Sequence, residues 1–168
     1  MSGYGPRARA DSTRPRRFGG ASGCPLNFTV RRRNFAMARA LTGRCLCEAV
    51  KFQVLDEFRY ALNCHCSQCR RATGSAFKAF GGIESAKLTV TEGSGTLLRY
   101  GDSDNHDARC SICGSFLYSL VRDGSYVHVN LGALADAPTL TPTAHIYVGS
   151  KASWYNITDS LPQHLELP

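Results

Sequence analysis

The chain has 168 residues, a hydrophobic content of 43% and a formal net charge of +7 at pH 7. This length is typical of one domain with its own core, and no apolar run approaches the roughly 18 residues of a membrane-spanning helix, so no membrane partner is expected. Residues 1–39 carry nine arginines and one acid, which leaves a net charge of −1 for residues 40–168. A nearly neutral domain argues against a nucleic-acid-binding zinc ribbon.

Residues 1–39 are rich in Gly, Ser, Pro and Arg and show no sustained apolar period, so we predict a basic, disordered or non-native extension. Three interpretations stay open: an organelle-targeting presequence within residues 1–36, an anion-binding arm, or translated sequence upstream of a true start at Met37. The last is favoured, because the sequence after Met37 leads directly into the first cysteine motif. Cys24 lies apart from the other cysteines and is expected to be an unliganded thiol. The predicted domain spans residues 40–168.

The other seven cysteines fall into three tight groups. These are Cys45-x-Cys47, Cys64-x-Cys66-x-x-Cys69 and Cys110-x-x-Cys113. Thiolates at such spacings chelate a metal more readily than they form distant disulfide cross-links, and Zn²⁺ is the common ion that takes this soft ligand set. Metal-binding cysteines indicate a reducing compartment, so we expect a cytoplasmic protein, with organelle targeting by the N-terminal segment left open.

The first C-x-C motif is followed by strand-like alternation at Val50, Phe52 and Val54. Side chains at i and i+2 point to the same side of an extended chain. Cys45 and Cys47 are therefore expected to offer two sulfurs to one ion.

A second strand over residues 60–62 is expected to deliver Cys64, and a short helix carrying Cys69 is predicted over residues 67–73, ending at Gly74. Three short strands should follow, separated by glycine-rich turns. They cover residues 77–83, 88–91 and 96–100, with turns at Gly81-Gly82 and Gly93-Ser94-Gly95.

Residues 102–107 form a predicted polar loop that contains His106, before the zinc-knuckle turn Cys110-Ser-Ile-Cys113-Gly114. A hairpin is expected over residues 116–130. Its strands are 116–121 and 126–130, and its turn is Asp123-Gly124. A last strand is predicted over 145–148, and Trp154 with Leu161-Pro162 should pack against the sheet. Many short strands with glycine-rich turns indicate a mostly β fold.

Coordination chemistry suggests how the cysteines divide. Two pairs make a closed four-thiolate site of the structural kind, whereas three thiolates leave a tetrahedral ion one position short, where water or a substrate thiol could bind. Spacing alone leaves open which groups meet. Spacing also leaves open a fourth protein ligand for the three-cysteine group, which would make that site a second structural metal site. The candidates are His65, His106, His128 and His145.

In succession, these motifs resemble the glutathione-dependent formaldehyde-activating enzyme family over about residues 40–162. The matching stretches are Gly43-Arg-Cys45-Leu-Cys47, residues 64–77 with the Arg70-Arg71-x-x-Gly74-Ser75 continuation, and Cys110-Ser-Ile-Cys113-Gly114-Ser115. The resemblance implies a small zinc-stapled Mss4-like domain of short antiparallel strands with little helix. It also implies two zinc ions per chain, a structural one and a second one near which glutathione binds. The ligands would be Cys45, Cys47, Cys110 and Cys113 for the first, and Cys64, Cys66 and Cys69 for the second.

The resemblance further implies a carbon–sulfur lyase or synthase that handles glutathione–aldehyde adducts such as S-hydroxymethylglutathione, with the triplet as the catalytic metal site. Arg70 and Arg71 could hold the carboxylates of a tripeptide thiol, or could simply form a solvated turn. Gly74 and Ser75 could let a ligand approach the backbone, or could only end the helix. The sequence departs from the family pattern at Glu48 and Arg109, and the family has many divergent members. The identity of the aldehyde substrate is therefore left open.

The alternative function is a non-catalytic protein-binding module on the same zinc-stapled scaffold. The enzyme hypothesis predicts a glutathione-dependent change at the second metal, whereas the binding module predicts none. The sequence makes no prediction of the oligomeric state.

Overall fold

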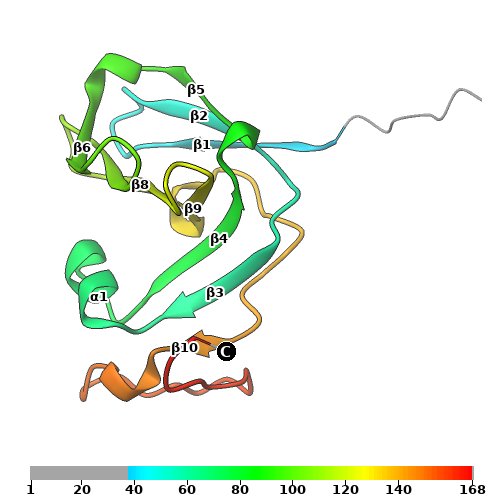
Figure 1. Ribbon diagram of the computed structural model, residues 1–168, viewed down its shortest axis with the longest axis vertical. Helices are drawn as coiled ribbons and strands as arrows, with labels where there is room; N and C mark the ends of the chain where they lie inside the picture. Colours follow the sequence, from blue (N-terminus) through cyan, green and yellow to red (C-terminus); the bar gives the residue numbers. More distant parts are fainter. Residues whose placement is uncertain (1–37, 168) are drawn as a thin grey trace, which may run out of the picture. The chain divides into compact units, whose positions relative to one another are not determined.

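The computed structural model describes residues 38–167, so the predictions for the basic extension, the start at Met37 and the thiol of Cys24 lie outside the described residues. The described chain is mostly β, with one α-helix, α1 (Ser67–Thr73) (Figure 1). The strands are β1 (Ala40–Arg44), β2 (Lys51–Leu55), β3 (Tyr60–Cys64), β4 (Lys78–Glu84), β5 (Leu88–Glu92), β6 (Leu97–Gly101), β7 (His106–Cys110), β8 (Phe116–Val121), β9 (Tyr126–Asn130) and β10 (His145–Ile146).

The strands form two sheets. A three-stranded antiparallel sheet has the order β1-β2-β5, and a seven-stranded sheet has the order β10-β3-β4-β9-β8-β7-β6. Every pairing in the larger sheet is antiparallel except that of β10 with β3. The prediction of a mostly β domain of short, mainly antiparallel strands with little helix is confirmed. No helix within residues 38–167 combines the length and apolar character needed to cross a membrane.

The main hydrophobic core joins the two sheets. Phe52 and Val54 on β2 are 1% exposed, and they pack in one cluster with Leu117 on β8 and Val127 on β9. The rings of Phe52 and Tyr118 meet edge to face, with centroids 6.2 Å apart. Each fully buried side chain of this size contributes roughly 1.5–3 kcal/mol, so this cluster fixes the sheets against each other.

Helix α1 begins and ends as the sequence predicts. Its first turn has no acid, and the sulfur of Cys66 instead accepts a hydrogen bond from the backbone N–H of Cys69 at 3.3 Å, the role usually taken by a Ser or Asp oxygen. Gly74 ends the helix in the left-handed conformation, with φ 62°. A cysteine of the three-cysteine motif thus also caps the helix.

Two sequence predictions are wrong in the central strands. Gly81 and Gly82 do not separate strands but lie inside β4, where a Cβ would come within 2.7 Å of the Phe58 ring and 2.2 Å of the Tyr60 ring, respectively. The glycines make room for aromatic rings rather than for a turn. The predicted polar loop also ends early, because His106 begins β7 with its side chain buried.

Other differences lie at the ends of the domain. Cys45 and Cys47 follow β1 on a tight turn rather than on an extended strand, and Glu48 adopts a φ of 60° within it. The last predicted strand is shorter than expected, because a 3₁₀ turn over Val148–Ser150 follows β10. Trp154 does not pack against the sheet and is 71% exposed.

Candidate metal centres and adjoining clefts

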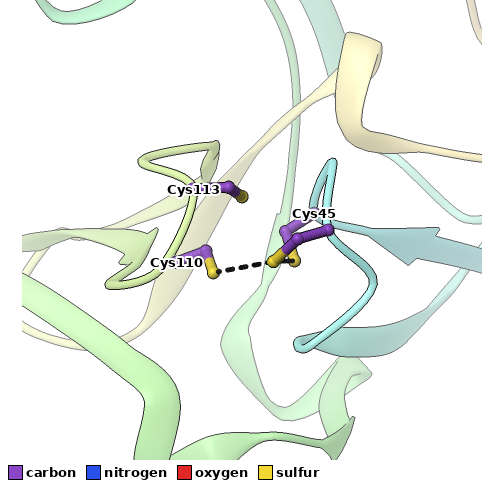
Figure 2. A group of neighbouring side chains, drawn as sticks. Cys45, Cys110 and Cys113 are labelled. Carbon is purple, nitrogen blue, oxygen red and sulfur yellow. Dashed lines mark hydrogen bonds between the residues drawn. The ribbon is translucent and has the colours of Figure 1, made fainter.

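Four cysteine sulfurs from two distant segments converge in a first cluster. The sulfurs of Cys45, Cys47, Cys110 and Cys113 all lie within 4.8 Å of one another. Figure 2 shows Cys45 approaching from one side and Cys110 with Cys113 from the other. The Sγ–Sγ distance is 3.5 Å between Cys45 and Cys47 and 3.7 Å between Cys47 and Cys110. These distances are far too long for disulfides, and all four thiols are free.

Tight turns on both sides hold these sulfurs in place. The N–H of Gly114, at φ 74°, donates to the carbonyl of Cys110 at 2.9 Å and closes the knuckle. The Ser115 hydroxyl lies 3.2 Å from Cys113 Sγ and accepts a hydrogen bond from Leu46 N–H at 3.0 Å, so it joins the two turns. Hydrogen bonds from the hydroxyl and the backbone of Ser115 lower the pKa of Cys113 to about 5. A thiolate at neutral pH is what a metal ligand requires.

The first cluster fits Zn²⁺ by its own geometry. A tetrahedral ion with Zn–S bonds of about 2.3 Å separates its sulfurs by about 3.8 Å. The two measured contacts, 3.5 and 3.7 Å, are close to this value. Cys45 and Cys110 are also nearly fully buried, at 2% and 1% exposed, within the main core. A cation there would tie the start of the domain to the β7–β8 turn.

The second cluster contains the three sulfurs of Cys64, Cys66 and Cys69, again within 4.8 Å of one another. Cys64 ends β3 and is buried, and Cys69 projects from α1. A hydrogen bond from the Cys69 thiol lowers the pKa of Cys64. Three soft sulfurs from one short segment suit a thiophilic ion such as Zn²⁺.

Within residues 38–167, no fourth His, Cys, Asp or Glu joins this group. The four candidate histidines are engaged elsewhere. His65 Nε2 lies 2.8 Å from His145 Nδ1, His128 Nε2 lies 2.8 Å from the Tyr60 hydroxyl, and His106 Nδ1 lies 3.0 Å from a backbone carbonyl. The described residues thus supply three ligands, and the sequence-based alternative of a histidine-closed site finds no support among them.

His65, next to Cys64 and Cys66, belongs to a chain of polar groups that runs from two buried histidines to the exposed carboxylate of Asp159. His65 and His145 are both 0% exposed, and Nε2 of His145 lies 3.0 Å from a carboxylate oxygen of Asp159. Burial is the main cause that lowers the pKa of His65 to about 4. The chain links the C-terminal segment to the loop that carries Cys64 and Cys66. Asp159 gave no signal in the sequence, because nothing in its neighbourhood predicts that it meets β10.

Lys78 is a buried cation beside the second cluster that the sequence analysis did not select. It is 5% exposed, donates a hydrogen bond to the Ser119 hydroxyl at 2.8 Å, and lies 4.3 Å from the Phe116 ring centroid. Burial lowers the pKa of this ammonium, and the negative charges of Cys69, Asp107 and Cys64 oppose that shift. Strand alternation places Lys78 on the same face as the buried Phe80, a signal that could have revealed it.

Two clefts adjoin the clusters and share Lys78, Ala72 and Phe116 in their walls. The smaller, of about 530 Å³, lies between α1 and strands β6–β9 and includes Cys69 of the second cluster. The larger, of about 890 Å³, includes Cys45 and Cys113 of the first cluster. Of these two clefts, as the described residues form them, the smaller one is therefore lined by a cysteine of the three-cysteine group.

The four residues predicted to contact glutathione are spread over the end of α1. Arg70 donates through Nε to the carbonyl of His65 at 3.2 Å, and Arg71 is exposed. Neither guanidinium has an ion-pair partner within residues 38–167. Gly74 is the helix cap, and Ser75 alone of the four lines a cleft, the larger one.

Comparison with known proteins assigns the chain to a family. The model of the glutathione-dependent formaldehyde-activating enzymes matches residues 40–150, which contain both cysteine clusters. The chain belongs to this family.

Two relatives extend the comparison. A Halomonas elongata protein, provisionally named a glutathione-dependent formaldehyde-activating enzyme, is 29% identical over 126 residues, covering 70% of this chain and 80% of the relative. A crystal structure of a Rhodobacter sphaeroides protein matches with 26% identity and a TM-score of 0.49, over 59% of this chain and 92% of that chain.

The two departures from the formaldehyde-activating family pattern have different roles. Glu48 forms an exposed ion pair with Arg44 at 3.1 Å. Arg109 donates to the carbonyl of Ala72 on α1 at 2.6 Å and stacks over Phe116, 4.2 Å from its centroid. Since Arg109 directly precedes Cys110 in β7, it connects the first cluster to the helix that bears the second.

Proposed function

We propose that this protein is a zinc-dependent carbon–sulfur lyase or synthase that forms or cleaves hemithioacetals of glutathione, such as S-hydroxymethylglutathione. Family membership and the Halomonas relative support a glutathione-related enzyme. One observation carries the finer proposal. The described residues bring three sulfurs and no fourth ligand to the second cluster, and one of those cysteines, Cys69, lines a cleft.

Each cysteine group has its own part in the proposal. Two zinc ions per chain are proposed, a structural one in the first cluster and a second one held by Cys64, Cys66 and Cys69. When bound in the second cluster, zinc would favour the thiolate form of an incoming thiol at neutral pH. The chain's own contribution is to hold the three sulfurs between the end of β3 and the first turn of α1. His65 and His145 brace that loop from the other side.

Glutathione carries two carboxylates, and the proposed groups that receive them are Arg70 and Arg71. Support comes from their position on the last turn of α1, directly after Cys69, and from their free terminal nitrogens. Gly74 and Ser75 would border the bound tripeptide where the helix ends. We propose residues 40–168 as the zinc domain, residues 1–39 as an extension, and the cytoplasm as the location.

Cobalt substitution tests the enzyme proposal directly. The full chain is loaded with Co²⁺, and glutathione is titrated while the absorption bands of cobalt–thiolate are recorded. We expect a change in these bands that saturates with glutathione and is absent with S-methylglutathione, which has no free thiol. A cobalt spectrum that stays constant at saturating glutathione would instead favour the non-catalytic protein-binding module.

A further inference from the structure

The smaller cleft has more room than formaldehyde needs. Formaldehyde has two non-hydrogen atoms and would fill on the order of 60 Å³, at about 30 Å³ for each water-sized unit. The cleft measures about 530 Å³. Clefts of this size hold ligands of many atoms, and their walls indicate which kind.

One part of the cleft wall is apolar, whereas polar side chains such as Gln68, Asn105 and His106 line other parts. Tyr100 on β6 is 77% exposed and borders the cleft, and Phe116, Leu120 and Val121 of β8 line it with half-buried side chains. An exposed tyrosine beside half-buried aliphatic residues offers contact area to an apolar group. This part of the wall, on β6 and β8, therefore fits a hydrocarbon or aromatic substituent.

The charges of the cleft are balanced, which does not suit a tripeptide with two carboxylates. Lys78 is the one Lys or Arg among the described residues that lines it. The carboxylate of Asp107 lies two hydrogen bonds away through Ser119, each bond 2.8 Å long. His128, the histidine on β9, is neutral at pH 7, because burial lowers its pKa to about 4. By contrast, the larger cleft has Arg44 and Arg109 in its walls.

Lys78 has hydrogen-bonding capacity to spare. An ammonium group has three N–H donors, and the only hydrogen bond that Lys78 donates within residues 38–167 goes to Ser119. The Phe116 ring covers another side of the ammonium at 4.3 Å. A buried donor beside Cys69, with an unused N–H, is placed to bind a ligand oxygen close to the sulfur cluster.

We propose that the smaller cleft is the carbonyl-acceptor site, that it takes an aldehyde with an apolar substituent, and that Lys78 donates a hydrogen bond to the aldehyde oxygen. This inference rests on the proposed function. As the thiolate adds, the C–S bond forms and the π pair of the carbonyl moves to oxygen, where Lys78 stabilises the charge. The oxygen then takes the proton that the thiol released, so the reaction is a redox-neutral addition of one thiol to one aldehyde. Lys78 is a catalytic residue in this scheme.

Binding of carboxylate analogues tests the site without relying on turnover. Benzoate has the carbon skeleton of benzaldehyde, and formate that of formaldehyde. With the zinc-loaded full chain in calorimetry, we expect benzoate to bind at least about tenfold more tightly than formate. Lys78→Met should weaken benzoate at least about tenfold while keeping two zinc ions. The matched control is Lys87→Met, which removes a surface lysine paired with Glu57 and should leave benzoate binding unchanged.

Tyr100→Ala keeps the test valid if Lys78→Met does not fold, because the Tyr100 side chain is 77% exposed. This variant should weaken benzoate several-fold and leave formate unchanged. Equal binding of benzoate and formate, benzoate binding that survives Lys78→Met, or a Lys78→Met protein that retains one zinc would each overturn the proposal. The last result would mean that the ammonium only balances the charge of the sulfur cluster.

Turnover separates this inference from the proposed function. With glutathione, the wild-type protein should consume benzaldehyde with a higher kcat/KM than formaldehyde. Turnover of formaldehyde without preference for benzaldehyde would refute the acceptor site and leave the enzyme proposal standing. Lys78-dependent benzoate binding without glutathione-dependent turnover of either aldehyde would refute the enzyme proposal and leave an apolar carboxylate- or carbonyl-binding cleft.

Discussion

Replacing one buried sulfur in each cluster should affect stability unequally. Cys110 and Cys64 are 1% and 4% exposed, so Cys110→Ser and Cys64→Ser make nearly the same local change. A metal in the first cluster would close the chain between Cys47 and Cys110, which are 63 positions apart. The second would close only the five positions from Cys64 to Cys69. Treating each as a cross-link, loop-closure entropy gives about 4 kcal/mol for the first and about 2 kcal/mol for the second.

Urea unfolding of the zinc-loaded full chain at a buffered free zinc concentration measures the difference. Each variant should lose one zinc by metal analysis, and Cys110→Ser should lose about 2 kcal/mol more unfolding free energy than Cys64→Ser. Matched losses in the two variants would refute the long-range cross-link. Two zinc ions retained in either variant would refute the assignment of that cysteine as a ligand.

Three further predictions follow from particular side chains. Arg71→Gln should raise the Kd for glutathione about two- to fivefold, as expected for an exposed, salt-screened ion pair with a carboxylate. The control Arg99→Gln on β6 should leave this Kd unchanged, and calorimetry measures both. Burial lowers the pKa of His128 in the folded state to about 4, below the ordinary histidine value of 6.5. The unfolded chain therefore binds this proton first on acidification, and stability falls as the pH drops from 6.5 towards 4. His65, whose pKa burial also lowers to about 4, contributes the same kind of loss in both proteins. Between pH 7 and 5 the loss should therefore be about 2 kcal/mol smaller in His128→Gln than in the wild type, and equal losses would contradict the prediction. Asp159→Asn should weaken retention of the second zinc against a chelator and leave the first unaffected, because it loosens the chain of histidines below Cys64 and Cys66.

Local patterns predicted most of the strands and the one helix. The helix over 67–73 and the hairpin strands 116–121 and 126–130 are confirmed to the residue, because turn glycines and alternating apolar residues mark their ends. The predicted turn at the two glycines of β4 is wrong, because these glycines make room for the rings of Phe58 and Tyr60, which come from elsewhere in the chain.

The cysteine clusters could be anticipated, but their surroundings could not. The division into four and three sulfurs matches the groups that the structure brings together, because thiol number and spacing limit the combinations. Their roles as metal ligands stay predictions. The contact of His145 with Asp159 depends on how the C-terminal segment folds back against β10. The placement of Lys78 beside Cys69 depends on how α1 packs against β4. No local pattern in the chain encodes such contacts.

The contact from Arg109 to the carbonyl of Ala72 has a mechanical consequence. The backbone of Arg109 directly precedes Cys110 in β7, and its guanidinium binds α1. A displacement of the first cluster would therefore be transmitted to the helix that bears Cys69. In an Arg109→Phe variant, that hydrogen bond has no donor. Metal content at the first cluster would then alter the alignment of the second cluster in this chain and would not do so in that variant.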